Sequence, residues 1–186
     1  FTLMDDGEGA DLLRRDKEDL GVGRFPVTNA IDAKTLVDKT INYALNKNGG
    51  SWENVLMFMG DDGNNNIHMR DLNETAESVS SAYPAYQIKK VMWDAYPRIS
   101  TATGNTYPEA SALIKQQQAQ GALIMDYAGH GKEDQISHEA VLRLVDFKNF
   151  SNTNLPLWIT ASCDIMPYDG VIPTIGEAAM LNSKGG

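Results

Sequence analysis

The 186-residue sequence has a single cysteine, Cys163, and no long apolar segment. One thiol cannot form an intrachain disulfide, so a fold held together by disulfides is excluded. No apolar run reaches the roughly 20 residues that a membrane-spanning helix needs. Basic residues are outnumbered, with 16 Lys and Arg against 25 Asp and Glu, and they form no cluster. We therefore expect neither a membrane span in this chain nor a nucleic-acid partner.

What the sequence does contain is the composition of a globular domain. Hydrophobic residues make up 42% of the chain and charged residues 22%. A chain of this length can bury one substantial core without being divided into two domains.

Short apolar runs alternate with helical patterns. We predict buried strands at residues 55–59, 86–93, 122–128 and 156–161, with a further strand at 21–25, because each run is bounded by turn residues. Apolar spacing and capping residues predict helices at residues 33–45, 67–82, 108–120, 137–147 and 174–181. This alternation is typical of an α/β fold with a mainly parallel sheet and helices on both faces.

Reactive side chains follow the predicted strands. Gly129-His130-Gly131 comes directly after one strand, and Cys163 follows the next, one strand–helix–strand interval further along. Asp61-Asp62 and Asp94 follow the two earlier strands. The carboxyl ends of parallel strands meet at one edge of a sheet, where ligands bind. We therefore expect His130 and Cys163 to lie side by side at that edge.

A thiol and an imidazole placed together suit acyl transfer. Cys163 would attack a peptide carbonyl, and His130 would exchange protons with it and with the leaving amine. The N–H groups of Gly131 and Cys163 would hold the oxyanion, and the glycines beside His130 leave room for a substrate backbone. Considered singly, Cys163 also fits a small buried core residue, and His130 a turn residue.

The same segments resemble a known family. The sequence at 126–131, Asp-Tyr-Ala-Gly-His-Gly, and that at 157–164, Leu-Trp-Ile-Thr-Ala-Ser-Cys-Asp, are similar to the catalytic core of the gingipain family of cysteine peptidases. The resemblance continues at residues 21–27, 38–39, 168–169, 176–181 and 185–186. Residues 93–96 and 107–108 are similar to one subgroup, the cell-surface sortases of the type IX secretion system.

The resemblance implies a caspase-like, three-layer α/β/α fold and a catalytic dyad of Cys163 and His130. It also implies protein or peptide substrates and a location outside the cell or on the outer membrane of a Gram-negative bacterium. Association with a secretion system would then occur through regions outside this chain. Compared with the catalytic domain of this family, residues 1–186 are expected to be part of one such domain, shortened at both ends.

Some alternatives stay open. Residues 132–136, Lys-Glu-Asp-Gln-Ile, stand where many family members have a tryptophan shortly after the histidine, so the substrate cleft differs. The residues do not decide whether water or another amine releases the acyl group. A non-catalytic, caspase-like surface module that binds proteins is the alternative function, although intact Cys163 and His130 favour the enzyme.

The remaining polar residues suggest smaller roles. Asp164 and Asp169 are candidate substrate-binding residues that would favour a basic side chain. We expect no catalytic metal and no required cofactor. Zinc is not expected because neither Cys-x-x-Cys nor His-x-x-x-His spacing occurs. Structural calcium remains an alternative at the acidic residues 5–11, whereas residues 62–66 fit a plain polar loop better. His138 is expected to be a surface residue near the start of a helix.

Overall fold

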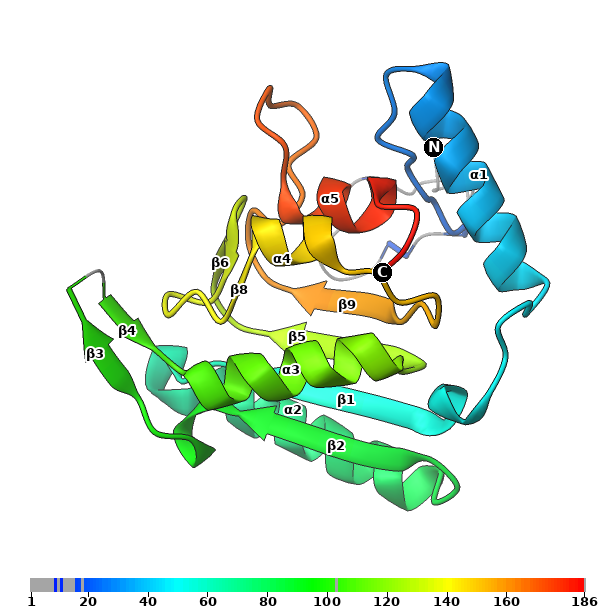
Figure 1. The fold of residues 1–186 in the computed structure, drawn as a ribbon. Helices are drawn as coiled ribbons and strands as arrows, with labels where there is room; N and C mark the ends of the chain where they lie inside the picture. The colour runs from blue at the N-terminus through cyan, green and yellow to red at the C-terminus, as the bar shows by residue number, and fades with distance from the viewer. Residues whose placement is uncertain (1–8, 10, 12–15, 18, 103, 186) are drawn as a thin grey trace.

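A four-stranded parallel sheet forms the centre of the protein (Figure 1). The computed structural model describes residues 9, 11, 16, 17, 19–102 and 104–185. The strand order is β2-β1-β5-β9, and every neighbouring pair is parallel. The strands are β1 (Val55–Gly60), β2 (Gln87–Met92), β5 (Ile124–Ala128) and β9 (Leu157–Ala161). Four of the five predicted strands are therefore confirmed as one parallel sheet.

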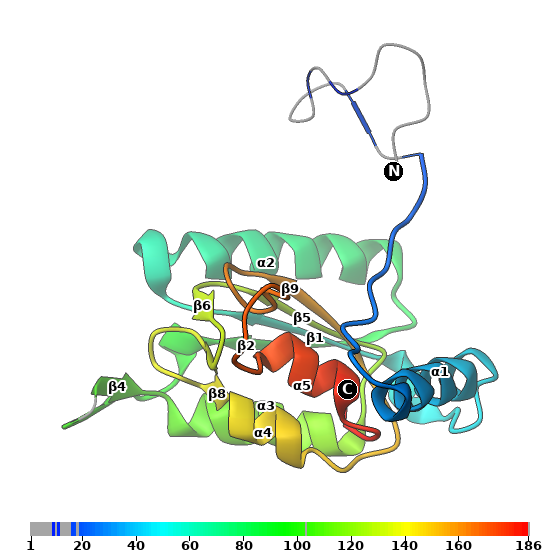
Figure 2. The ribbon, with the colours of Figure 1, turned by 90° about the horizontal axis from the view of Figure 1, so that it is seen from above.

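Helices cover both faces of this sheet (Figure 2). The long α2 (Gly63–Ala82) covers one face, and α3 (Pro108–Gln120), α4 (Leu144–Asn149) and α5 (Ile175–Leu181) lie on the other. The remaining helix, α1 (Ala30–Ala44), contacts α5 at the side of the molecule. The predicted three-layer α/β/α architecture is confirmed. Among the described residues, no helix has the length and apolar character needed to cross a membrane.

Local signals explain where the helices begin and end. The Thr174 hydroxyl accepts a hydrogen bond from the Glu177 N–H, and the Glu177 carboxylate accepts one from the Thr174 N–H, which makes a capping box for α5. Pro108 stands in the first turn of α3, where its missing N–H costs nothing. Gly121 ends that helix with φ of 89°, a conformation that glycine adopts without steric cost.

The core lies on both sides of β1, all six residues of which are buried. On the α3 side the largest buried side chains are Trp93, Tyr127 and Phe147. Under α2 a smaller apolar cluster is formed by Leu56, Phe58, Leu72 and Ala76. By contrast, β9 is one of the two edge strands of the sheet, and Leu157 on it is 55% exposed.

The helix predicted at residues 33–45 is confirmed as α1 but is less buried than its apolar stripe suggests, whereas the helix predicted at residues 137–147 is wrong. The apolar stripe of α1 is mostly exposed, with only Leu36 buried, because the helix lies beside the sheet and not over one of its faces. Residues 137–147 do not form one helix. Ser137 and Ala140 have positive φ of 64° and 50°, so the chain turns there and enters the short strand β8 (Leu142–Arg143) before α4.

Other short elements were missed or misassigned. Residues 21–25 contain no strand, contrary to the prediction. An antiparallel hairpin of β3 (Ile99–Thr101) and β4 (Gly104–Thr106) was not predicted. Nor was the small antiparallel sheet in which β6 (Gly131–Lys132) and β7 (Gln135–Ile136) pair with each other and β7 pairs with β8. Two short 3-10 helices cover Ser51–Asn54 and Trp93–Ala95. Strands of two or three residues carry too little periodicity to be recognised.

One half-buried lysine, Lys39, joins α1 to the end of α5 and leads to a prediction. The Lys39 ammonium donates hydrogen bonds to the carbonyls of Ala179 at 2.8 Å and Asn182 at 3.0 Å. Replacing Lys39 with Met leaves these helix-end carbonyls without their donor. We expect the free energy of unfolding to fall by about 1–3 kcal/mol, measured by urea denaturation.

The matched control is Lys34→Met on the same helix, whose exposed ion pair with Asp38 lies within α1. We expect it to change the free energy of unfolding by less than about 0.5 kcal/mol. Equal effects of the two substitutions would show that the Lys39 contacts do not stabilise the α1–α5 junction.

Candidate functional site

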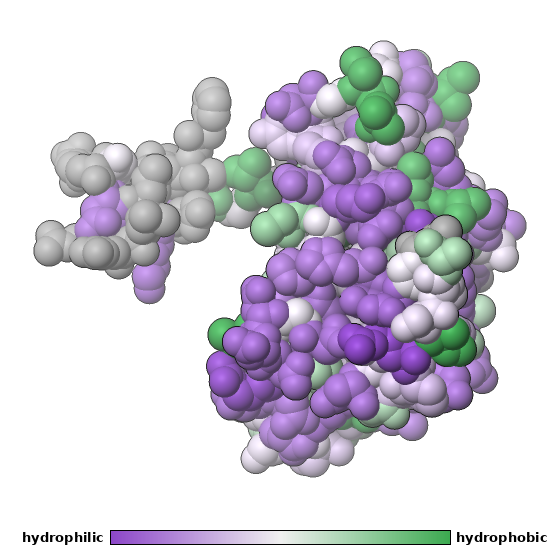
Figure 3. Space-filling model, turned by 90° about the vertical axis from the view of Figure 1, so that its left-hand side faces the viewer, coloured by the Kyte–Doolittle hydropathy of each residue, from purple (hydrophilic) through white to green (hydrophobic). Residues whose placement is uncertain are grey.

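The predicted functional residues gather at the carboxyl ends of the strands. Gly60 of β1 pairs with Ala128 of β5, and Ala128 pairs with Ala161 of β9, so the three strands end level with one another. The segments carrying Asp61, His130 and Cys163 follow these strand ends directly. Figure 3 views the molecule from this side and shows a mainly hydrophilic surface.

The segments that carry His130 and Cys163 pack directly against each other. The Gly129 N–H donates to the Ala161 carbonyl at 3.3 Å. A Cβ added to Gly131 would lie only 2.4 Å from Ser162 Oγ and 2.5 Å from the Ile165 Cδ1 atom. Such distances are too short for a side chain, so glycine is required at position 131 for the two segments to approach. The predicted placement of His130 and Cys163 on neighbouring strand ends is confirmed.

The Cys163 thiol is free and exposed to solvent, which excludes a buried core cysteine. His130 is half-buried, and no hydrogen bond joins it to Cys163 in the described part of the chain. Catalytic contacts of this kind are often loose when no substrate is bound. Asp164 and Asp169 are both exposed, and Asp164 has a left-handed backbone with φ of 51°.

A buried carboxylate, Asp61, fixes the backbone of His130. Its Oδ2 atom accepts a hydrogen bond from the His130 N–H at 2.6 Å. The Tyr127 hydroxyl lies 3.3 Å from the same oxygen and donates to the His130 carbonyl at 2.6 Å. Burial and the neighbouring Asp61 charge raise the pKa of Tyr127, so its hydroxyl keeps the proton that it donates. The N–H and the C=O of His130 are both held in this way.

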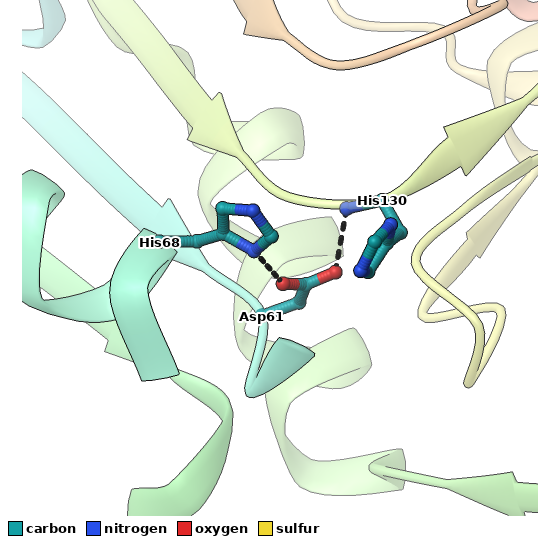
Figure 4. A group of neighbouring side chains, drawn as sticks. All are labelled: Asp61, His68 and His130. Atoms are coloured by element: carbon teal, nitrogen blue, oxygen red, sulfur yellow. Dashed lines mark hydrogen bonds and ion pairs between the residues drawn. The ribbon is translucent and has the colours of Figure 1, made fainter. Parts of the chain in front are cut away.

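The second oxygen of Asp61 faces a histidine from α2. His68 Nδ1 lies 2.5 Å from Asp61 Oδ1, and the side chain of Asp61 is only 2% exposed. Figure 4 shows the rings of His68 and His130 on either side of the carboxylate. The two rings meet edge to face, with their centroids 5.2 Å apart. Asp61 therefore links a helix on one face of the sheet to the segment that carries His130.

The third histidine also belongs to this cluster. The His138 ring stacks on the His130 ring with a centroid separation of 4.3 Å and an interplanar angle of 13°. His138 is exposed, as expected, but it lies in a turn and not at the start of a helix. The other two histidines of the chain thus both contact the His130 ring, an arrangement that no local spacing in the sequence predicts.

Two sets of residues bear on metal binding. Ligand atoms of Asp61, His68 and His130 all lie within 4.8 Å of one another. Residues 62–66 fit the expected polar loop in their backbone, because Asp62 precedes α2 and the first residues of α2 include three asparagines with left-handed, non-helical φ and ψ, Asn64, Asn65 and Asn66. The acidic residues 5–8, the alternative calcium ligands, lie outside the described residues. Their neighbours Gly9 and Asp11 donate backbone N–H groups to the Asp16 carboxylate.

Comparison with solved structures finds the same fold. A crystal structure of the Arg-specific cysteine proteinase gingipain R superposes with a TM-score of 0.66 and 20% sequence identity, covering 88% of this chain and 36% of the other. A complex of the pro- and mature domains of RgpB from Porphyromonas gingivalis gives a TM-score of 0.67 and 19% identity, covering 90% of this chain and 38% of the other. The chain thus spans little more than a third of these proteins.

The sequence comparisons address the family directly. No curated protein matches the sequence. The profile described as peptidase family C25, in contrast, matches residues 1–186. The match covers the whole chain, and the structures of gingipain R agree with it in fold. The chain therefore belongs to peptidase family C25, the gingipain family of cysteine peptidases.

Proposed function

We propose that this chain carries the acyl-transfer site of a cysteine peptidase, with Cys163 as nucleophile and His130 as acid and base. The observation that supports this most is the pairing of β5 with β9. It brings an exposed thiol and an anchored imidazole to adjacent, touching segments at the carboxyl edge of the sheet. Membership of a cysteine peptidase family supports this role for the pair.

The reaction begins when the Cys163 thiol loses its proton to His130 and the thiolate attacks a peptide carbonyl carbon. The N–H groups of Gly131 and Cys163 hold the negative oxygen that forms. His130 then gives its proton to the leaving amine, and a thioester with Cys163 remains. Water attacks the thioester with His130 as base, which releases the acid and restores the thiol.

In this scheme Asp61 and Tyr127 position the base. They bind the His130 C=O and N–H, so the ring extends from a backbone that is fixed by hydrogen bonds on both its polar groups. A reacting group held in place contributes through geometry, and small displacements of it are costly to the rate. The chemistry uses only side chains and backbone of this chain and requires no cofactor; any calcium would have a structural role.

The substrates are proteins or peptides. Asp164 directly follows the nucleophile in sequence, and Asp169 lies in the same segment further along; both acids are exposed and would favour a basic side chain in the substrate. The description of gingipain R as Arg-specific is consistent with such a preference.

The finer proposal is a sortase-type transpeptidase that processes C-terminal signals of type IX secreted proteins. An amine of a second molecule would then replace water in the release step. Its support is the resemblance of residues 93–96 and 107–108 to that subgroup. These residues include Trp93 and Tyr107, which are both buried. The Tyr107 hydroxyl donates a hydrogen bond at 2.7 Å to Asp62, the residue that follows Asp61. The location would be secreted or on the outer-membrane surface, with regions outside this chain making the attachment.

The first test removes the nucleophile. Cys163→Ala deletes one sulfur from an exposed position, so the fold should be retained. We expect peptide turnover by the full-length protein to fall to the background rate, measured with a fluorogenic peptide of basic P1 residue. Unchanged circular dichroism would show that folding is intact. Turnover near the wild-type rate would place the chemistry elsewhere.

The second test disturbs the positioning of His130. Asp61→Asn keeps the size of the side chain but removes the negative charge beside His68. In one orientation of the new amide, its NH2 group also lies against the His130 N–H, which needs an acceptor. We expect kcat to fall by about 100-fold or more, the range for misplaced acid–base groups, with a smaller change in KM.

Asp62→Asn is the matched control, since the neighbouring carboxylate contacts Tyr107 and not His130. A loss of kcat in the control as large as that in Asp61→Asn would show that the effect is not specific to the His130 anchor.

The third test separates hydrolysis from transpeptidation. With a peptide substrate and an added amine such as a glycine peptide, a transpeptidase forms the amide product at the expense of the free acid. Mass spectrometry of the products measures the ratio. We expect the amide to increase with amine concentration, whereas free acid alone at every concentration would limit the activity to hydrolysis.

A further inference from the structure

We infer that Asp61, His68 and His130 form a binding site for a zinc ion that holds the enzyme in an inactive form. Ligand atoms of the three side chains already lie within 4.8 Å of one another. They come from different parts of the fold: Asp61 follows β1, His68 lies on α2 and His130 follows β5. Because these elements pack together in the core, the three ligands are held on a rigid frame.

The carboxylate is oriented as a metal ligand is. Metal-binding groups are normally held by a second set of hydrogen bonds that fix their direction. Here the His130 N–H donates to Asp61 Oδ2 at 2.6 Å, and the Gly63 N–H donates to Asp61 Oδ1 at 3.2 Å. The Asn64 amide lies 3.4 Å from His68 Nε2, on the far side of that ring. These contacts leave Asp61 Oδ1 and His68 Nδ1 turned toward each other.

A metal ion can enter between Asp61 Oδ1 and His68 Nδ1, which now share a hydrogen. They are 2.5 Å apart, a distance that requires a proton between them. Zinc bonds of about 2.0–2.2 Å in tetrahedral geometry place two ligand atoms roughly 3.3 Å apart. The His68 side chain is 20% exposed and can therefore rotate, which widens the distance between its Nδ1 atom and Asp61 Oδ1. A ring nitrogen of His130 supplies the third ligand, and water takes the fourth position.

The donor set selects the kind of metal. Two imidazoles and one carboxylate are the three protein ligands of many open zinc sites. Calcium and magnesium prefer six or more oxygen ligands and gain little from imidazole nitrogen. His138 is not a ligand, because its ring is stacked within 13° of parallel on the His130 ring. Its nitrogens therefore point alongside those of His130 and do not converge with them on one position.

The consequence for activity rests on the proposed function. A His130 nitrogen bonded to zinc cannot accept a proton from Cys163 or pass one to the leaving amine. Zinc would therefore inhibit the enzyme reversibly without contacting the thiol. This distinguishes the site from metal capture by a cysteine and histidine pair, which needs the sulfur.

Isothermal titration of the full-length protein with zinc chloride tests the binding directly, whether or not the protein is active. We expect one zinc ion to bind to the wild type, to Cys163→Ala and to His138→Gln, the matched histidine control. Affinity should fall by more than about 100-fold in His68→Gln and in His130→Gln, a loss beyond that typical of second-shell changes. Circular dichroism of each variant checks that it folds.

Three outcomes would overturn the inference. Absence of zinc binding in folded wild type removes the site. Loss of binding in Cys163→Ala with retention in His68→Gln assigns the metal to the thiol instead. Loss in His138→Gln equal to that in His68→Gln shows that the ligands are different. Magnesium and calcium chloride serve as metal controls and should give no heat of binding.

Inhibition by zinc is tested separately, by measuring peptide turnover. Zinc should abolish peptide turnover of the wild type, and a chelator should restore it, whereas the residual turnover of His68→Gln should resist the same zinc concentration. Zinc bound by titration without inhibition would contradict the regulatory role while leaving the site in place. A protein that binds zinc in this pattern but has no peptidase activity would contradict the proposed function alone.

Discussion

The site depends on one buried carboxylate. Asp61 is almost fully removed from solvent, and an isolated charge in such a position is costly unless hydrogen bonds compensate it. Those bonds come from the His130 backbone on one side, and from His68 and the Gly63 N–H on the other. The requirement to satisfy Asp61 therefore ties the end of β1, the start of α2 and the segment after β5 into one unit. The position of His130 is a consequence of that unit.

The parallel sheet supplies the other constraint. Because β5 lies between β1 and β9 with their ends level, His130 has Asp61 on one side and the Cys163 segment on the other. The close approach of these segments depends on small residues. A Cβ on Gly129 would lie 2.6 Å from the Asp61 Cγ atom, and one on Gly131 would lie 2.4 Å from Ser162 Oγ. The two glycines thus allow Asp61 and the segment that carries Cys163 to approach the segment of His130 from either side.

Only some of these features could be predicted from the sequence. The four apolar strands and the edge that bears His130 and Cys163 could be predicted, because continuous buried runs and strand-end residues are local signals. The roles of His68 and His138 could not, since they reach His130 only through the packing of α2 and the turn before β8. The expectation of no zinc site relied on local ligand spacing, whereas Asp61, His68 and His130 meet from three segments. The apolar stripe of α1 was recognised, but a stripe does not reveal whether a sheet covers it.

The most direct measurement for the Cys163–His130 pair is covalent labelling of the full-length protein with a peptidyl chloromethyl ketone, followed by mass spectrometry. We expect a single adduct on the peptide that contains Cys163, forming rapidly in the wild type and at least about 100-fold more slowly in His130→Ala, because the histidine generates the thiolate. Absence of an adduct, or equal labelling rates in the two proteins, would contradict the assignment of Cys163 and His130 as a catalytic pair.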